Sequence, residues 1–338
     1  MSQLTGKPFI EVTRGGLVES VHEVAACAVD RQGEVVLAMG DIETPVYLRS
    51  AAKPFIAAAV IKYGAQQRFG LEQHEIALMA ASHSGEPFHV EGVASILRKI
   101  GLPQSALQCG AHAPYNSTAA IALERAGQPF TALHNNCSGK HAGILALCLL
   151  LGSDTTTYMD LHNTAQQEVL KFCARVTGDD PSTFPLGVDG CGIPVFATSL
   201  HHAAQAFFRF ATLTNVEPKD AHALAMVRDA MISYPWYVSG TGEFDATLMD
   251  ASGGSIACKA GAEGVHGVAA LEAGFGLALK VLDGSKRAVA PASTALLDHL
   301  QLLNPAALTQ LRPFLQPQLI NRSGRVVGEL RAQRAILG

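Results

Sequence analysis

The segment Arg49-Ser-Ala-Ala-Lys-Pro54 contains a serine and a lysine at a spacing that could support nucleophilic chemistry. Residues three apart on a helix are neighbours, so Lys53 could reach the Ser50 hydroxyl. A helix beginning here would also direct backbone N–H groups at a developing oxyanion. Ser50 is therefore a candidate nucleophile and Lys53 its candidate base. A serine helix cap followed by a solvated lysine gives the same pattern.

A lysine can accept a proton only as a neutral amine, which requires burial or a second cation nearby. Lys259, at the end of a predicted strand in Cys258-Lys-Ala-Gly-Ala-Glu-Gly264, could supply that cation. Between these segments lies the polar turn Ala81-Ser-His-Ser-Gly-Glu-Pro87, whose simplest interpretation is a helix cap. The order Ser-x-x-Lys, serine-rich turn and Lys-x-Gly parallels penicillin-binding proteins and serine β-lactamases. The last two elements depart from the usual Ser-Asp-Asn and Lys-Thr-Gly.

Two glycine-rich turns each contain one cysteine, Cys137 in the first and Cys191 in the second. With His134 or His141, these thiols could bind zinc, but they lie 54 positions apart and lack the usual close Cys-x-x-Cys pair. Packing of small residues around crowded turns is the alternative. The phosphate-loop pattern Gly-x-x-x-x-Gly-Lys-Ser/Thr is absent from these turns, so nucleotide binding is not expected.

Composition narrows the class of protein. The 338 residues include 25 Lys plus Arg and 29 Asp plus Glu, and this net charge of -4 argues against a nucleic-acid partner. Seven widely spaced cysteines and the lack of a visible secretory signal predict a reducing, cytoplasmic setting. The longest apolar stretch, 142–152, is shorter than the roughly 20 residues that span a bilayer, so no membrane crossing is expected.

The hydrophobic periodicity predicts the elements that must position these side chains. The ends of the chain alternate as strands do, and the middle has helical periodicity. The predicted strands are 9–13, 21–29, 35–39, 255–259, 264–271 and 275–281, with a final hairpin over 319–330; helices are predicted over 161–175, 197–210 and 219–232.

Strands at both ends predict one central antiparallel sheet flanked by helices, an α+β class that can also be described as an α/β sandwich. We expect the sheet to come from about 5–48 and 253–335 and a mostly helical part from about 50–250. No repeat or hydrophilic linker marks a boundary, so the whole chain, 1–338, is predicted to form a single domain.

Taken together, five segments resemble the asparaginase II family, also called class 3 L-asparaginases, along nearly the whole chain. They are Arg49-Ser-Ala-Ala-Lys-Pro54, Ala81-Ser-His-Ser-Gly-Glu86, Asn135-Asn-Cys-Ser-Gly-Lys-His-Ala-Gly143, Gly187-Val-Asp-Gly-Cys-Gly-Ile-Pro194 and Lys259-Ala-Gly-Ala-Glu-Gly264. The resemblance implies a fold like that of serine β-lactamases and glutaminases, hydrolysis of L-asparagine to L-aspartate and ammonia, and a homodimer.

Carried over residue by residue, the resemblance pairs Ser50 with Lys53 and Ser82 with Lys259, with Ser50 as the nucleophile. It also implies a zinc site made of Cys137, Lys140, Cys191 and a water, with zinc tuning the pocket and not required for the chemistry. No organic cofactor is implied.

An asparagine substrate is a zwitterion, so its α-carboxylate needs a cation and its α-ammonium an anion. Arg49 and Asp189 are the candidates. The expected function is thus an L-asparagine amidohydrolase that uses a serine acyl-enzyme. The alternatives are a glutaminase or broader amidase on the same fold, and a non-catalytic amino-acid-binding protein.

Overall fold

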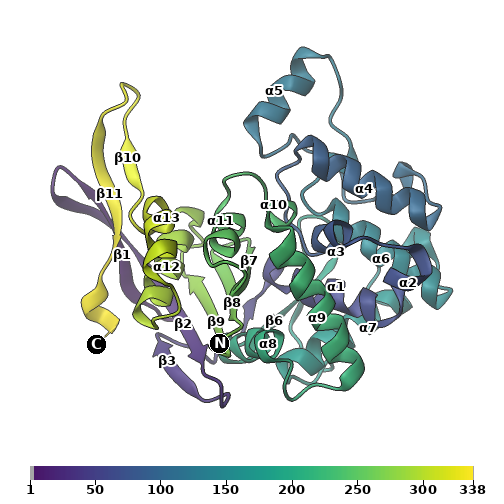
Figure 1. Ribbon diagram of the computed structural model, residues 1–338, viewed down its shortest axis with the longest axis horizontal. Coiled ribbons are helices and arrows are strands. Elements are labelled where there is room, and N and C mark those ends of the chain that lie inside the picture. Colours follow the sequence, from purple (N-terminus) through teal and green to yellow (C-terminus); the bar gives the residue numbers. More distant parts are fainter. Residues whose placement is uncertain (1–3, 338) are drawn as a thin grey trace. The chain divides into compact units, whose positions relative to one another are not determined.

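Strands from both ends of the chain meet in one eight-stranded sheet (Figure 1). The computed structural model describes residues 4–337, which divide into two units. The first unit holds the sheet and consists of the described residues up to Ala51, 198–212 and 247–337. The second unit consists of 52–197 and 213–246.

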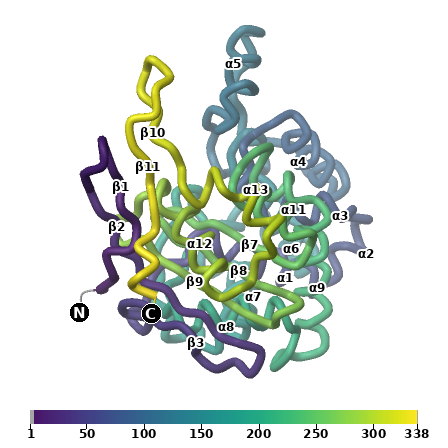
Figure 2. The backbone as a smooth tube through the Cα atoms, turned by 60° about the vertical axis from the view of Figure 1, so that its left-hand side comes forward, coloured from purple at the N-terminus to yellow at the C-terminus, as the bar shows by residue number. Residues whose placement is uncertain are grey.

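In the first unit the strand order is β10-β11-β1-β2-β9-β8-β7, with β3 also paired to β2, and adjacent strands are antiparallel. Figure 2 shows the hairpins β1–β2 and β10–β11 side by side. The strands are β1 (Lys7–Arg14), β2 (Leu17–Val29), β3 (Val35–Met39), β4 (Val46–Tyr47), β7 (Ile256–Gly261), β8 (Val265–Ala270), β9 (Phe275–Val281), β10 (Gln318–Ile320) and β11 (Val326–Ala332).

Helices cover both faces of this sheet. A Cβ on Gly267 of β8 would meet the Phe207 ring of α8 (Leu200–Thr212) at 1.8 Å. The preceding residue, His266, instead hydrogen-bonds Ser293 of α12 (Val289–His299) through its Nδ1, at 2.9 Å. Because successive residues of a strand point to opposite faces, α8 and α12 lie on opposite sides. Helix α13 (Pro305–Leu315) packs against α12.

The second unit is built around α1 (Lys53–Lys62), whose composition is apolar nearly all round and whose residues are almost all buried. A helix without a polar face belongs inside a bundle, and α1 contacts α3, α6, α7 and α9. The further elements of this unit are α2 (Ala65–Phe69), α3 (Gln73–Met79), α4 (Pro87–Ile100), α5 (Ser117–Arg125), α6 (Ser138–Leu151), α7 (Thr164–Thr177), β5 (Leu186–Val188), α9 (Pro218–Ser233) and α10 (Pro235–Val238); β6 (Pro194–Thr198) and α11 (Phe244–Ala251) cross the unit boundary.

The predicted class is confirmed: the structure has an antiparallel sheet from the two ends of the chain, helices on both faces and a mostly helical middle. The structure also contains elements that the prediction did not name. The C-terminal part includes α12 and α13 besides its strands, and the mostly helical middle includes the short antiparallel pair β5–β6. The predicted helix over 197–210 begins at Leu200 because the residues before it form β6. The single domain expected for 1–338 stays a prediction.

Candidate active site

Ser50 lies in the turn that leads from the first unit into α1. Arg49–Ala52 forms a 3-10 turn, and Arg49 has a φ of 51°, a left-handed conformation that is unusual for a residue with a side chain. Lys53 is the first residue of α1 and Pro54 the second, where proline needs no backbone donor. The expected place of Ser50 at a helix start is therefore observed. Its side chain is buried.

Strand β7 passes directly against the backbone that carries Ser50. A Cβ on Gly261 would lie 2.5 Å from the Leu48 carbonyl oxygen and 3.2 Å from the Ala51 nitrogen, so only glycine fits without a shift. Lys259 is two residues earlier and therefore on the same strand face. It is only 1% exposed, and its Nζ donates a hydrogen bond to the Ala260 carbonyl at 2.7 Å. In the first unit, the geometry thus directs Lys259 to the side of β7 that faces the Ser50 turn.

In the second unit, the structure joins Lys53 to the other candidate serine. Lys53 Nζ donates to Ser82 Oγ at 2.9 Å and to the Ala81 carbonyl, and the lysine is only 1% exposed. The Ser82 backbone is held by its N–H, which donates to the Val238 carbonyl at 2.9 Å. The predicted pairings of Ser50 with Lys53 and of Ser82 with Lys259 stay predictions.

His83 ties the Ser82 turn to the start of α6. Its Nδ1 accepts from the Gly85 N–H at 3.2 Å, and its Nε2 lies 2.8 Å from Ser138 Oγ. The Ser138 hydroxyl in turn donates to the Leu133 carbonyl. Burial lowers the pKa of His83 well below its ordinary value, and nearby cationic and imidazole groups lower it further. A neutral ring with its proton on Nε2 satisfies these contacts. Sequence reasoning did not identify this role, because no spacing indicates it.

Cys137, Lys140 and Cys191 meet in the second unit although 54 positions separate the two thiols. Cys137 precedes α6, and Lys140 lies on its first turn. Cys191 comes from the loop between β5 and β6, and Lys140 Nζ donates to its Sγ at 2.9 Å. The two thiols also lie close enough for each to affect the pKa of the other. The structure therefore brings together the three protein ligands that the resemblance implied.

The pKa values of the three groups in this cluster are shifted from their ordinary values. The hydrogen bond from Cys191 lowers the pKa of Cys137 well below its ordinary value, with help from the charges of Lys53 and Lys140. The same hydrogen bond, with burial, raises the pKa of Cys191. Burial lowers the pKa of Lys140, but the adjacent thiols more than offset this, so the net shift is upward. Without a metal, these directions favour the charged forms of Cys137 and Lys140 and the neutral thiol of Cys191.

This donor set fits zinc. Thiolate sulfur and amine nitrogen are suitable ligands at roughly 2.1–2.3 Å, which in a tetrahedron separates ligand atoms by about 3.5 Å. The observed separation of 2.9 Å between Lys140 Nζ and Cys191 Sγ needs only a small expansion. Within residues 4–337, no group of three His, Cys, Asp or Glu donors includes Cys137 or Cys191, so neither His134 nor His141 completes the site.

The two predicted substrate-binding residues are placed in different units. Arg49 lies beside Ser50 in the 3-10 turn of the first unit. Asp189 lies in the β5–β6 loop of the second unit, where its Oδ1 accepts from the Gly190 N–H at 2.7 Å. Both lie next to other site residues in the chain, and their roles toward a substrate stay predictions.

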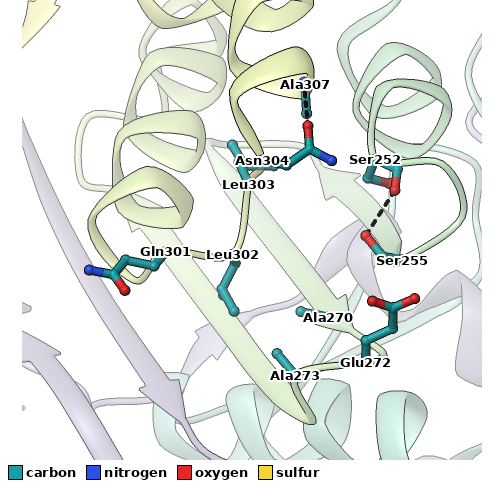
Figure 3. A pocket seen from close by; sticks show the side chains of 10 residues that line it. All are labelled: Ser252, Ser255, Ala270, Glu272, Ala273, Gln301, Leu302, Leu303, Asn304 and Ala307. Atoms are coloured by element: carbon teal, nitrogen blue, oxygen red, sulfur yellow. Dashed lines mark hydrogen bonds between the residues drawn. The ribbon is translucent and has the colours of Figure 1, made fainter.

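A separate pocket of about 400 Å³ lies in the first unit, between the end of β8, the α11–β7 loop and the α12–α13 connection (Figure 3). Glu272, Gln301 and Asn304 line it, but Asn304 Oδ1 already accepts from the Ala307 N–H. The lining contains none of the predicted site residues. The size of this pocket therefore does not make it the candidate active site, because the reactive side chains lie elsewhere.

The family model of L-asparaginase II matches residues 10–332, a range that includes every residue of the candidate site. The chain belongs to the L-asparaginase II family. Membership of this family supports an amidohydrolase, an enzyme that cleaves amides.

No curated protein matches the chain. No described helix combines the length and the apolar composition needed to cross a membrane.

Three solved structures that are similar to this L-asparaginase II family member share little of its sequence. One structure of Mglu is 13% identical with a TM-score of 0.39, and the match covers 83% of this chain and 67% of Mglu. A second Mglu structure, in 4.3 M NaCl, is 14% identical with a TM-score of 0.39 and coverages of 83% and 61%. The chain thus spans about two thirds or less of the Mglu chains. A protein of Bacteroides dorei DSM 17855 that is provisionally named a beta-lactamase is 14% identical, with a TM-score of 0.40 and coverages of 81% and 93%.

Proposed function

We propose that this L-asparaginase II family member hydrolyses the side-chain amide of L-asparagine to L-aspartate and ammonia. The observation that carries the proposal is the hydrogen bond at 2.9 Å from Nζ of the buried Lys53 to Oγ of the half-buried Ser82. A serine hydroxyl becomes a useful nucleophile only when a neighbouring group can take its proton, and a lysine shielded from water is suited to this task.

In the proposed reaction, Ser50 Oγ attacks the amide carbon and Lys53 takes the hydroxyl proton. Lys53 then delivers that proton to the departing ammonia, which leaves a β-aspartyl ester on the serine. Water hydrolyses the ester, releases L-aspartate and restores the hydroxyl. Backbone N–H groups would stabilise the oxyanion in both steps. Ser82 and Lys259 would form the second serine–lysine pair and support proton movement at the site.

The substrate ammonium and carboxylate would be recognised by charge. Arg49 would bind the α-carboxylate and Asp189 the α-ammonium, since each has the required sign and lies next to a proposed site residue. Asparagine and glutamine carry the same charged groups and differ by one methylene in their side chains, so these charges alone do not distinguish the two amides. A glutaminase or broader amidase with the same residues is therefore the second candidate function, and a non-catalytic amino-acid-binding protein the third.

Cys137, Lys140 and Cys191 would hold zinc, with water as the fourth ligand. When bound, zinc would supply positive charge that neutralises the thiolates beside Lys53. The chemistry assigned above to Ser50 and Lys53 does not require it.

A coupled ammonia assay with asparagine, glutamine and the β-lactam nitrocefin tests the proposal. We expect asparagine to be the best substrate and Ser50→Ala to lower kcat at least about a thousandfold. Lys53→Met should do the same. Ser255→Ala, at a serine outside the site, is the matched control and should keep wild-type turnover.

Circular dichroism of each variant checks that its fold is intact. Wild-type ammonia release by a folded Ser50→Ala protein would reject Ser50 as the nucleophile. If Ser82→Ala alone removes activity, the nucleophile is Ser82, with Lys53 as its base. Asparagine binding without ammonia release would favour the non-catalytic alternative.

A further inference from the structure

The pocket in the first unit (Figure 3) has a lining whose polar groups suit one class of small molecule. We propose that it binds a small primary amine in its charged form, an alkylammonium ion. The described lining residues all lie within 252–307, so they belong to the first unit. None of them has a role in the proposed amide hydrolysis or zinc binding. The inference therefore goes beyond the proposed function and does not depend on it.

Glu272 gives this pocket its charge. Among the described residues that line the pocket, it is the one with an ionisable side chain, and it is exposed. Arg31 lies nearby, but its guanidinium donates to the backbone carbonyl of Glu272, at 2.9 Å. That hydrogen bond leaves the side-chain carboxylate of Glu272 for a ligand. A negative charge in the wall attracts cations and repels carboxylates and phosphates.

Two serines add hydrogen-bond acceptors to the same wall. The Ser255 hydroxyl donates to the Ser252 carbonyl, and the Ser252 hydroxyl donates to the Met249 carbonyl, each at 2.9 Å. A hydroxyl has one proton and two lone pairs, so each oxygen can now only accept a further hydrogen bond. Figure 3 shows the Ser255 hydroxyl on the same side of the pocket as the Glu272 carboxylate. A primary ammonium, which has several N–H donors and no acceptor, matches this wall.

The opposite side of the pocket is apolar. Figure 3 shows the Leu302 side chain across from Glu272, and Ala270, Ala273 and Leu303 also line the pocket. An aliphatic chain on the ammonium would lie against these side chains, which removes apolar surface of both partners from water. The volume of about 400 Å³ is at the lower end of the range for small-molecule sites, so the ligand should be small.

The remaining polar side chains make other ligands less suitable. Asn304 Oδ1 accepts from the Ala307 N–H, which leaves its amide nitrogen as one neutral donor. One such donor does not hold a carboxylate against the charge of Glu272, which argues against amino acids. Figure 3 shows the Gln301 amide pointing away from these groups. None of the described lining residues is aromatic, so a nucleobase would find no ring on which to stack.

Titration of the full-length protein with n-butylamine, followed by ligand-observed NMR at low ionic strength, tests the proposal. We expect saturable binding that Glu272→Gln weakens at least about tenfold, because hydrogen bonds to a charged group are lost. Ser255→Ala should weaken it by about threefold, since it removes one neutral acceptor. Glu34→Gln makes the same charge change at an exposed residue between β2 and β3 and should leave the affinity unchanged.

Analogues of n-butylamine identify the feature that the pocket recognises. The neutral n-butanol and the anion butyrate should each bind at least about tenfold more weakly, because they lack the positive charge. The n-butyltrimethylammonium ion keeps the charge but has no N–H donor, and it should also lose at least about tenfold. Nα-acetyl-lysine amide carries the same ammonium on a lysine side chain. It should bind more weakly than the free amine, because its larger peptide end does not fit a small pocket.

Several results would overturn the proposal. They are an affinity for n-butylamine that Glu272→Gln does not change, tighter binding of butyrate, n-butanol or the lysine amide, and binding that does not saturate below about 10 mM. Glu272 is exposed, so its substitution should not disturb the fold, and circular dichroism checks this. Because the readout is amine binding and not ammonia release, a failed asparaginase assay leaves the result unaffected, and the reverse also holds.

Discussion

The lysines of the candidate site are buried almost completely, which is rare for this residue type. Lys53 and Lys259 are 1% exposed and Lys140 is 2% exposed. Each finds a local partner: Lys53 a serine hydroxyl, Lys259 a backbone carbonyl and Lys140 a thiol. Because shielding an amine from water costs free energy, these local partners are needed to keep the three lysines inside the fold.

The protonation of the thiol–lysine cluster would make the proposed zinc binding depend on pH. Lys140 and Cys191 both have raised pKa values, so both must lose a proton to bind the metal, whereas the lowered pKa of Cys137 favours its thiolate. The affinity for zinc should therefore rise with pH. If two protons are released, the rise should be up to about a hundredfold per pH unit near neutrality. Competition with a chromophoric zinc chelator, repeated at several pH values between roughly 6.5 and 8, measures how steeply the affinity changes with pH.

Lys140→Met is the matched variant for the zinc measurement. The methionine keeps a long side chain but removes one metal ligand and the proton that this ligand must lose. The affinity for zinc should therefore fall, and it should change by only about tenfold per pH unit. A wild-type affinity that is the same across this range would contradict the assigned protonation states.

Gly261 should control the position of the Ser50 turn. In Gly261→Ala the new Cβ would meet the Leu48 carbonyl, so the backbone that carries Ser50 must shift. A displacement near 1 Å can lower turnover roughly a hundredfold, and the overpacking should cost about 1–3 kcal/mol of folding free energy. Steady-state ammonia release and thermal unfolding measure the two effects.

Gly267→Ala is the control for Gly261→Ala. It overpacks the sheet against α8, because the three atoms nearest to the new Cβ all belong to the Phe207 ring and none to the Leu48–Ala51 backbone. It should therefore lose stability and keep kcat per folded molecule. Equal kcat losses in the two variants would show that general destabilisation, and not the position of the Ser50 turn, explains the effect.

The chemistry at the residue scale could be predicted only in part from the sequence. Residue type and spacing predicted Ser50, Lys53 and Lys259 as candidate reactive groups, and all three side chains are buried. The hydrogen bond from Lys53 to Ser82 was not predicted, because it joins the start of α1 to the turn after α3, and tertiary packing alone decides that meeting. The histidine that fixes the turn, His83, had no sequence signal for the same reason.

At the scale of elements, the start of α4 depends on a neutral histidine. His89 Nδ1 accepts from the Glu86 N–H at 3.1 Å, and its Nε2 lies 2.9 Å from the Trp236 carbonyl. Burial lowers the pKa of His89 to about 4. Protonation of Nδ1 would break the capping hydrogen bond.

The free energy of unfolding should therefore fall as the pH drops from about 6.5 towards 4. The unfolded histidine takes up a proton in this window but the folded one does not, so the stability is complete above 6.5 and is lost as the pH approaches the folded-state pKa. The loss from His89 should be about 3 kcal/mol at most. Urea unfolding at a series of pH values measures it, and His89→Gln should flatten the slope. An unchanged slope would assign the acid sensitivity to other groups, such as His83.

Elements with strong local signals were predicted well. Strands β1, β2, β3, β8 and β9 fall within a few residues of the expected ranges. Helix α13 was missed although Asn304 and Pro305 give an N-cap and a first-turn proline, a start signal that the sequence does contain. The short strands β5 and β6 had no usable signal, since three to five residues cannot show a period.

At the scale of the whole molecule, the chain passes between its two units after Ala51, Ala197, Thr212 and Ala246. Neither unit is a continuous piece of sequence. Loss of either unit would lengthen the loops that the other must close, which costs conformational entropy. This connectivity favours the single domain predicted for the chain.

We therefore expect the two units to unfold together. The chain has one tryptophan, Trp236, which lies in α10 of the second unit, whereas far-UV circular dichroism reports on both units. Urea unfolding followed by the two signals should give coincident midpoints. Separate midpoints would show two independently stable units.

Light scattering of the same sample tests the homodimer, which stays a prediction.

The central position of β1 in the sheet has a consequence for biosynthesis. Its neighbours are β2, made at once, and β11, made last; β3 pairs with the same edge of β2 as β1, further along the strand, and β9 pairs with the opposite edge. At the usual rates of translation, the ribosome needs on the order of tens of seconds to reach β11. Throughout that time the nascent hairpin carries an unpaired edge, so newly made chains should need a holding chaperone more than refolded ones do.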